Sequence, residues 1–193
     1  RSYLRYMKGT DMKQTYKCRI VSKKEISDGI FDFTIENGDI AKAAQCGQFL
    51  HIDCGEKTFL RRPISICDAY EDKIRFIFQV KGSGTKALAD IDEGGYINVM
   101  GPLGHGFEIR EDLNNAVIIG GGIGVFPLYM LAKKISADVF LGFRSKELVV
   151  MEDEFKAVSK SVTVGTDNGS YGYNGYIASA MEKTAAEAGV HIV

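Results

Sequence analysis

The sequence has no excess of charge of either sign and no long apolar run. Its 193 residues include 24 Lys and Arg against 25 Asp and Glu, which gives a formal net charge of −1. Balanced charge argues against a general nucleic-acid binder and against an electrostatic membrane anchor, because both need a basic surface. No apolar run approaches the roughly 20 residues of a transmembrane helix, and no signal-peptide pattern is present. We therefore expect a cytoplasmic protein that binds neither nucleic acid nor membrane.

The cysteines do not form a C-x-x-C pair. All four lie in the first 67 residues of the chain, at Cys18, Cys46, Cys54 and Cys67. Without a sign of secretion, this pattern predicts free, reduced and mostly buried thiols. Their spacing does not suggest that they converge, so we expect no metal site in this chain.

Side-chain catalysts are also scarce. The three histidines, at positions 51, 105 and 191, do not have the spacing of metal ligands, and His51 is expected to lie on a strand face. No Ser-His-Asp set, HExxH motif or pair of carboxylates stands out. Any redox activity would therefore have to come from bound cofactors.

Residues 15 to about 108 have the pattern of β-strands. Apolar and polar residues alternate over residues 16–21, 30–35 and 48–54, and apolar runs follow at 74–80 and 96–100. Short strands separated by glycine-rich turns predict an antiparallel sandwich or barrel. We expect one helix to begin after residues 82–85, and a loop over residues 101–107, which hold one proline and three glycines.

The second half alternates strands with helices. Strands are predicted at residues 115–119, 137–143, 161–164 and 190–193, and helices at about 125–135, 152–158 and 174–188. This order is typical of a parallel sheet covered by helices. The predicted fold class is therefore β followed by α/β: an antiparallel β-barrel domain over residues 13–110, then a parallel-sheet nucleotide-binding domain over residues 111–193. Residues 1–12 are expected to be a tail outside the fold, and the second domain to be truncated inside its last strand.

The first candidate binding motif is the arginine pair before Pro63. A proline in a strand pattern marks an edge, a bulge or a strand start, and it holds the preceding residue extended. Arg62 would then offer its planar fork to a phosphate, and Ser65 its hydroxyl to another polar atom of the same ligand. The alternative is an exposed basic pair, and the motif alone does not decide between the two.

The strongest local signal is the glycine run Gly120-Gly121-Gly122-Ile123-Gly124, which follows an apolar strand and opens a predicted helix. Glycines let a diphosphate approach the backbone, and a helix N-terminus supplies N–H donors. The spacing differs from the usual G-x-G-x-x-G, so a tight strand–helix turn is the alternative. About 20 residues further on, a standard dinucleotide site has an acidic residue. Arg144 stands there instead, which taken alone favours a 2′-phosphate and hence NADP.

Two other segments are candidate ligand contacts. Gly84-Thr85, at a predicted helix start, either caps the helix or binds an anion, and capping is the more common role. A polar loop that begins Thr166-Asp167 follows a predicted parallel strand. Ligands of open α/β sheets lie at the carboxyl ends of strands, so this loop is either a ligand contact or an ordinary connection.

In this order, the motifs resemble the ferredoxin–NADP reductase superfamily. The particular motifs and their order look like those of the electron-transfer subunits of bacterial NAD-linked dihydroorotate dehydrogenase. The matching stretches run from about Met12 to the end of the chain and comprise residues 61–66, 82–85, 100–107, 120–124 and 166–170, with Gly172 and Gly175.

The resemblance implies FAD on the barrel and NAD(H) on the α/β domain. Arg62 would meet the FAD diphosphate and Ser65 the flavin ring, with no catalytic residue beyond the flavin. The implied FAD contacts are Arg62, Pro63, Ile64, Ser65, Ile77, Phe78, Gln79, Gly84 and Thr85. The implied NAD(H) contacts are Gly120, Gly121, Gly122, Gly124, Thr166 and Asp167. We follow the family's preference for NAD over the interpretation of Arg144, because this domain is not a standard dinucleotide-binding unit.

The resemblance also implies a partner and a third redox centre. An FMN-containing dihydroorotate dehydrogenase catalytic subunit would oxidise dihydroorotate, and this chain would pass the electrons through FAD to NAD in pyrimidine biosynthesis. Family members hold a 2Fe–2S centre on four cysteines beyond the last strand predicted here, and the cysteines of this chain do not replace them. Two alternatives stay open: an FAD subunit of a related NAD(P)H:ferredoxin or sulfide-type oxidoreductase, and a non-catalytic nucleotide-binding module.

Overall fold

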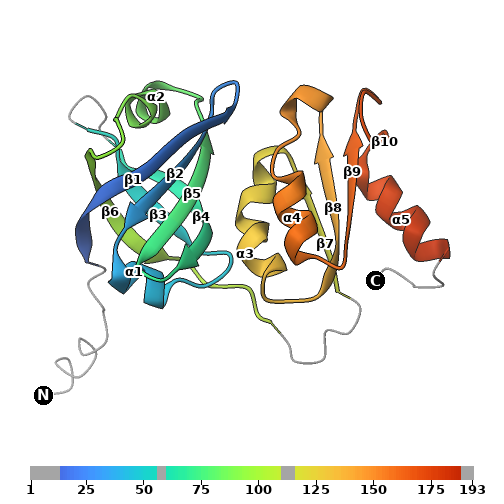
Figure 1. Ribbon diagram of the computed structural model, residues 1–193, viewed down its shortest axis with the longest axis horizontal. Helices are drawn as coiled ribbons and strands as arrows, with labels where there is room; N and C mark the ends of the chain where they lie inside the picture. The colour runs from blue at the N-terminus through green and yellow to red at the C-terminus, as the bar shows by residue number, and fades with distance from the viewer. Residues whose placement is uncertain (1–13, 56–59, 110–115, 188–193) are drawn as a thin grey trace, which may run out of the picture.

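The computed structural model describes residues 14–55, 60–109 and 116–187 of the chain. Six antiparallel strands close into a barrel, in the order β1-β2-β5-β4-β3-β6, and a parallel four-stranded sheet follows, in the order β10-β9-β8-β7 (Figure 1). The predicted fold class, an antiparallel barrel followed by a helix-covered parallel sheet, is confirmed.

The elements fall into two groups along the chain. The barrel group contains β1 (Thr15–Ser27), β2 (Ile30–Glu36), α1 (Gly38–Ala43), β3 (Phe49–Asp53), β4 (Arg62–Tyr70), β5 (Lys73–Gln79), α2 (Ser83–Ala89) and β6 (Tyr96–Leu103). The second group, here called the α/β part, contains β7 (Ala116–Gly121), η2 (Gly122–Leu128), α3 (Tyr129–Ala132), β8 (Ala137–Phe143), η3 (Lys146–Leu148), α4 (Glu152–Val158), β9 (Ser161–Thr166), β10 (Tyr173–Asn174) and α5 (Ile177–Glu187).

The barrel interior is filled by the apolar members of the alternating strands. The rings of Phe33 and Phe76 pack at 5.8 Å between centroids, on the neighbouring strands β2 and β5. Burying one such side chain stabilises the fold by roughly 1.5–3 kcal/mol. The fully buried barrel residues include Ile20, Phe33, Ile35, Leu50, Ile52, Ile66, Ile74, Phe76 and Val99.

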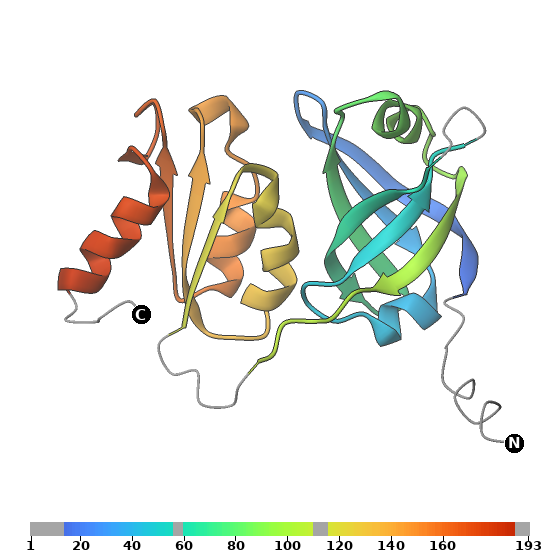
Figure 2. The ribbon, with the colours of Figure 1, turned by 180° about the vertical axis from the view of Figure 1, so that it is seen from behind.

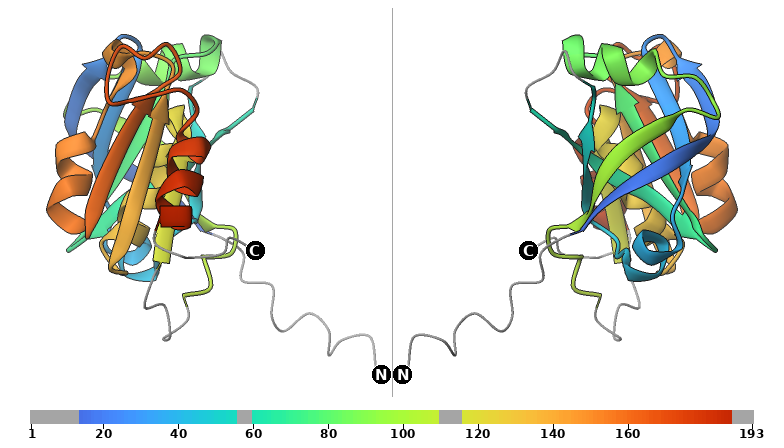
Figure 3. Two further views of the ribbon diagram at one scale, coloured as in Figure 1. Left: turned by 90° about the vertical axis from the view of Figure 1, so that its right-hand side faces the viewer. Right: turned by 90° about the vertical axis from the view of Figure 1, so that its left-hand side faces the viewer.

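Helices cover both faces of the parallel sheet. The segments η2, α3 and α4 lie between the sheet and the barrel, whereas α5 lies on the outer face against β8 and β9 (Figures 1, 2 and 3). The core of the α/β part also includes residues of the barrel, because Ile30, Cys67 and Ile77 pack in one cluster with Phe126. The barrel and the α/β part therefore share a continuous apolar interface.

Several predicted boundaries were wrong. Strand β6 continues to Leu103, through a cis Gly101–Pro102 bond, into the segment predicted as a loop. The predicted helix over 125–135 is a 3-10 helix, η2, with Pro127 inside it, followed by the short α3. The helix predicted from residue 174 begins at Ile177, because Tyr173 and Asn174 pair with β9. Helix α1 was not predicted at all.

Some predictions fall outside the described residues. These are the strand at 190–193, the tail over 1–12, and a domain boundary placed at residues 110 and 111. The barrel ends with β6 and the sheet begins with β7. Because the boundary between them lies outside the described residues, the domain limits stay a prediction. Within the described ranges, no helix combines the length and the apolar character needed to cross a membrane.

Candidate functional site

Arg62 opens β4, and its guanidinium lies against the start of α2. A Cβ atom on Gly84 would come within 2.8 Å of the guanidinium carbon, so the absence of a side chain lets the arginine rest on the helix backbone. Arg62 Nη1 also donates to the carbonyl oxygen of Leu60 at 2.7 Å. The fold thus brings together Arg62 and Gly84, which are separated in sequence and were both predicted as phosphate contacts.

The hydroxyl of Thr85 closes the turn that leads into α2. Its oxygen accepts hydrogen bonds from the backbone nitrogens of Lys81 and Gly82, at 2.9 and 3.2 Å, and donates to the carbonyl of Gly82 at 3.1 Å. These bonds belong to the capping role that the sequence left open as the alternative. Thr85 therefore shapes the backbone around Gly84.

The other predicted barrel contacts lie on β4 and β5, which are neighbouring antiparallel strands. Ser65 is half-buried and pairs with Phe49, and Pro63 is exposed. The side chains of Ile64, Ile77 and Phe78 are buried in apolar clusters, so a ligand could meet these residues only through their backbone. Gln79, at the end of β5, faces a cleft.

This interdomain cleft, with a volume of about 550 Å³, lies between the barrel and the carboxyl edge of the parallel sheet. Open α/β sheets bind their ligands at this edge. The barrel lines it with Ile30, Gln79 and Lys81; the α/β part lines it with Gly121, Gly122, Ile123, Phe126, Gly142, Phe143, Arg144, Leu148, Val150, Asp167, Tyr176, Ile177 and Ala178.

The glycine run has more than one role. A Cβ on Gly120 would lie 2.5 Å from the side chain of Leu128, so Gly120 allows η2 to pack on β7. Gly121 and Gly122 line the cleft, and Gly122 has a φ of +52°, which side-chain-bearing residues rarely adopt. No atom lies within 4 Å of a Cβ placed on Gly122 or Gly124, so the backbone there is open to a ligand.

A second set of glycines brings α5 close to the sheet. Gly121, Gly142 and Gly165 stand side by side on β7, β8 and β9. A Cβ on Gly142 would lie 2.6 Å from Ile177, and one on Gly165 would lie 3.2 Å from the same side chain. The start of α5, with the neighbouring Tyr176, is therefore held at the cleft.

Where β9 ends, Thr166 has a structural role, whereas the next residue, Asp167, is accessible from the cleft. Thr166 is fully buried, and its hydroxyl donates to the carbonyl of Tyr171 at 2.8 Å and accepts from its backbone nitrogen at 2.9 Å. Asp167 faces the cleft, and its backbone nitrogen donates to Phe143 at 2.9 Å. Thr166 thus closes the loop, and Asp167 shares the cleft with Arg144.

The four cysteines are free and buried, as predicted. Burial raises the pKa of the Cys18 thiol to about 11, and burial also raises the pKa values of Cys54 and Cys67. A thiolate, not a thiol, is the metal ligand. Across the described ranges, no three His, Cys, Asp or Glu side chains gather into a metal site.

The sequence did not point to several cleft residues. Ile30 and Lys81 were missed because they reach the cleft only when the two parts pack together. Gly142 and Phe143 end a predicted parallel strand, and Tyr176 follows a glycine-rich turn, so strand ends and turns were signals that could have found them.

Comparisons with known proteins give consistent results. No family model matches the chain. The "dihydroorotate dehydrogenase B (NAD(+)), electron transfer subunit" of Caldanaerobacter subterraneus subsp. tengcongensis is 38% identical over 179 residues, covering 91% of this chain and 70% of the relative. The protein of the same name from Lysinibacillus sphaericus is 37% identical over 182 residues, covering 89% of this chain and 70% of the relative.

Solved structures have the same architecture. An NADH-dependent reduced ferredoxin–NADP oxidoreductase, studied for flavin-based electron bifurcation, superposes with a TM-score of 0.81 at 36% identity. That match covers 91% of this chain and 66% of the other, so this chain spans slightly less than two thirds of it. The ferredoxin NADP⁺ reductase of Neisseria gonorrhoeae, solved with FAD and NADP, gives 0.76 at 16% identity over 93% and 81% of the two chains, which shows the fold alone.

Proposed function

The chain belongs to the family of electron transfer subunits of dihydroorotate dehydrogenase B (NAD(+)), and we propose that it carries electrons through bound FAD between a dihydroorotate dehydrogenase catalytic subunit and NAD. Dihydroorotate oxidation is a step of pyrimidine biosynthesis, and the partner would be the FMN-containing subunit. The observation that supports this role most directly is the cleft, in which Gln79 at the end of β5 faces Gly121 and Gly122. A flavin on the barrel side and a nicotinamide on the sheet side would meet there.

On the barrel, Arg62 would bind the diphosphate of FAD. A charge-assisted hydrogen bond of this kind contributes roughly 1.5–3 kcal/mol. Gly84 leaves the room that the guanidinium occupies, and Thr85 holds the backbone turn beside it. Ser65 would approach the flavin ring, and Pro63, Ile64, Ile77, Phe78 and Gln79 would border it. Bound flavin would supply the hydride-transfer chemistry that no side chain here can supply.

On the α/β part, we propose NAD(H) as the dinucleotide. Gly121, Gly122 and Gly124 would let its diphosphate approach the backbone, whereas Gly120 and Thr166 would shape the site by packing. The carboxylate of Asp167 in the cleft would repel a 2′-phosphate and would accept hydrogen bonds from a ribose diol. Arg144, in the same cleft, is the residue that would favour NADP(H), and the family name favours NAD.

The cysteines of this chain do not fit a 2Fe–2S centre. Such a centre needs thiolates that converge on the cluster irons. Burial keeps Cys18, Cys54 and Cys67 protonated, and the described part of the chain has no cluster of metal-binding side chains. We therefore derive no electron-transfer step through an iron–sulfur centre held by these residues.

The decisive experiment is an anaerobic absorbance titration of the purified protein with NADH, with NADPH as the matched control. We expect a flavin spectrum that NADH bleaches, and a slower reaction with NADPH. A colourless protein that FAD does not restore would contradict the proposal. A flavin that stays oxidised in NADH would leave a non-catalytic nucleotide-binding module as the remaining function.

A second candidate is the FAD subunit of a related NAD(P)H:ferredoxin oxidoreductase. It is favoured by the 36% identity and the TM-score of 0.81 to the NADH-dependent reduced ferredoxin–NADP oxidoreductase. The acceptor of the electrons distinguishes the two functions. After reduction by NADH, transfer to ferredoxin supports the second candidate, and transfer that needs an FMN-containing dihydroorotate dehydrogenase subunit supports the first.

A further inference from the structure

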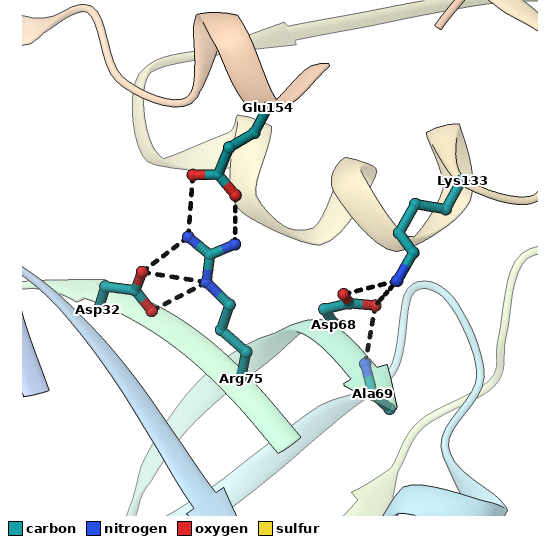
Figure 4. A network of polar contacts seen from close by, with 6 residues as sticks. All are labelled: Asp32, Asp68, Ala69, Arg75, Lys133 and Glu154. Atoms are coloured by element: carbon teal, nitrogen blue, oxygen red, sulfur yellow. Dashed lines mark hydrogen bonds and ion pairs between the residues drawn. The ribbon is translucent and has the colours of Figure 1, made fainter. Parts of the chain in front are cut away.

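Arg75 bridges the barrel and the α/β part at a polar cluster on the edge of their interface (Figure 4). From β5, its Nη2 donates to Asp32 of β2 at 2.7 Å, and its Nε donates to both carboxylate oxygens of Asp32 at 3.0 Å. On the other side, Nη2 donates to Glu154 of α4 at 3.0 Å, and Nη1 pairs with the second oxygen of Glu154. One guanidinium thus binds carboxylates of both parts.

A second ion pair joins the same two parts. Lys133, directly after α3, donates from Nζ to the Asp68 carboxylate of β4 at 2.7 and 3.0 Å. The backbone nitrogen of Ala69 holds the same carboxylate at 2.9 Å (Figure 4). Asp68 is buried, and the side chains of Asp32 and Arg75 are only 13% and 15% exposed. Their partners across the interface, Lys133 and Glu154, are 36% and 40% exposed, so salt screens the cross-interface pairs in part.

The Arg75 ion pair connects two elements that border the cleft. Arg75 and the cleft residue Gln79 lie on the same strand, β5. Helix α4, which holds Glu154, begins just after the cleft residue Val150. Lys133 follows the helical segment that starts at the cleft residue Gly122, whereas its partner Asp68 lies on β4, of which no residue lines the cleft. A movement of α4 relative to β5 would therefore shift elements that border the cleft.

The apolar interface alone would not fix this geometry. Burial of Phe126 against Ile77 and Cys67 attracts the two parts, but the hydrophobic effect has no preferred direction. A forked guanidinium held by two carboxylates has one preferred geometry. The ion pairs therefore add an orientation to an interface that burial has already formed.

We propose that Arg75 and its partner Glu154 are positioning residues that hold the α/β part at the angle to the barrel at which flavin and nicotinamide come within reach of hydride transfer. The inference rests on the proposed function, and it names residues outside both cofactor sites. Hydride transfer needs the reacting atoms about 3–3.5 Å apart, and a displacement of about 1 Å costs up to roughly 100-fold in rate.

The test uses Glu154→Gln, which removes the charge on the α/β side at a side chain that is 40% exposed and leaves the Arg75–Asp32 pair in the barrel. Arg75→Met is the stronger variant, and Arg75→Lys is the conservative one, which keeps a charge. The matched control is Lys86→Met, which removes an ion pair with Asp90 inside α2 and its C-cap and does not touch the interface.

Two measurements distinguish a loss of positioning from a loss of folding and from a failure of the proposed function. The first is the distance between spin labels on Asp92→Cys in the barrel and Lys183→Cys in α5; both positions are exposed, and the native thiols are buried. The second is the single-turnover rate of flavin reduction at saturating NADH, measured beside the affinity for FAD.

We expect Glu154→Gln and Arg75→Met to broaden the label distances and to slow flavin reduction about tenfold, with FAD affinity unchanged. Arg75→Lys should recover part of the rate, and Lys86→Met should match the wild type in both readouts. Unchanged distances and rates in both interface variants would overturn the inference. If NADH does not reduce the wild-type flavin, the proposed function fails, and the label distances still decide whether the ion pairs hold the two parts.

Discussion

At the scale of single residues, Arg62 depends on a neighbour that has no side chain. Its guanidinium occupies the space that a Cβ on Gly84 would fill, whereas Arg61 beside it donates to the backbone carbonyls of His51 and Asn98 at 3.3 and 3.2 Å. Two adjacent arginines thus have different surroundings, one at a helix start and one bound to neighbouring strands. Their substitution should have different effects.

Arg62→Ala should weaken FAD binding by about 2 kcal/mol, or roughly 30-fold in Kd, because a charge-assisted hydrogen bond to the diphosphate is lost. Fluorescence titration of the apoprotein with FAD measures this change. Arg61→Ala is the control and should change the Kd much less. Equal Kd values for wild type and Arg62→Ala would mean that Arg62 does not bind FAD and is an ordinary surface charge.

Asp167 is expected to select the dinucleotide. Asp167→Ser removes the carboxylate that would repel a 2′-phosphate, so the ratio of kcat/KM for NADH to that for NADPH should fall about tenfold. Steady-state reduction of an artificial acceptor with each dinucleotide gives this ratio. Asp153→Ser, which changes a fully exposed carboxylate on α4 outside the cleft, should leave the ratio as it is. A ratio that stays constant in Asp167→Ser would assign selection to another residue.

Cys18 should make the fold less stable in alkali. Burial raises its pKa from 9.0 to about 11, so above pH 9 the unfolded chain loses this proton while the folded chain keeps it. The free energy of unfolding should therefore fall between pH 9 and 11, by up to about 2 kcal/mol from this group. Urea unfolding at pH 8 and pH 10.5 measures the fall. Cys18→Ala should show a smaller decrease, and an equal decrease in both proteins would refute the assignment.

At the scale of elements, the alternation of apolar and polar residues and the continuous apolar runs predicted most of the strands. Strand β8 and helix α4 have the predicted limits. Strands β1, β2 and β9 are longer than predicted, and β5 is shifted by one residue at both ends. Their alternating or continuous apolar patterns reflect burial directly, which is why local sequence was sufficient.

Elements that depend on local exceptions were not predicted. The Asn37-Gly38 pair follows the predicted strand at 30–35, and the Asn37 side chain accepts a hydrogen bond from the backbone nitrogen of Ile40 at 2.9 Å and caps α1. Pro102 was read as part of a loop, although β6 passes through it. In both cases the same residues are common in turns and in the observed structure, so composition could not decide.

The candidate site was predictable where it depends on motifs and not where it depends on packing. Gly121, Gly122 and Asp167 were predicted and line the cleft, and Arg62 and Gly84 were predicted and lie together. The interface pair of Arg75 and Glu154 has no sequence signature, because its partners are 79 residues apart and meet only through the packing of the two parts.

Gly84→Ala should separate helix stability from ligand binding in α2. Alanine is favoured over glycine within helices by up to about 1 kcal/mol, so the free energy of unfolding should not fall. The added methyl group would displace the Arg62 guanidinium, so FAD affinity should decrease. Urea unfolding and FAD titration measure the two effects. Gly38→Ala, in the first turn of α1, is the control for binding, because its methyl group would meet Asp72 at an ordinary 3.8 Å. Unchanged FAD affinity in Gly84→Ala would mean that Arg62 does not bind FAD from this position.

At the scale of the whole molecule, the barrel and the α/β part share one apolar cluster. Phe126 of η2 is almost completely buried in it, together with Ile77 of β5. Shared burial couples the two parts, because exposing one face also exposes the other. The chain should therefore behave as one cooperative unit.

Differential scanning calorimetry should show a single unfolding transition for the wild type. Phe126→Ala should cost about 3–5 kcal/mol and split the transition in two, because the lost ring joins the parts. Ile52→Ala, in the barrel core, should lower the transition temperature without such a split. Two transitions in the wild type would show that the parts unfold independently.

The buried thiols have a consequence for the lifetime of the protein in air. Reduced flavins pass electrons to dioxygen and generate peroxide. A chain with a bound flavin is therefore close to a source of oxidant. Peroxide attacks exposed thiolates, and the cysteines here are 0–3% exposed, with three of them kept protonated by burial. Oxidation by this peroxide should therefore reach the half-buried Met100 and Met181 before it reaches the cysteines.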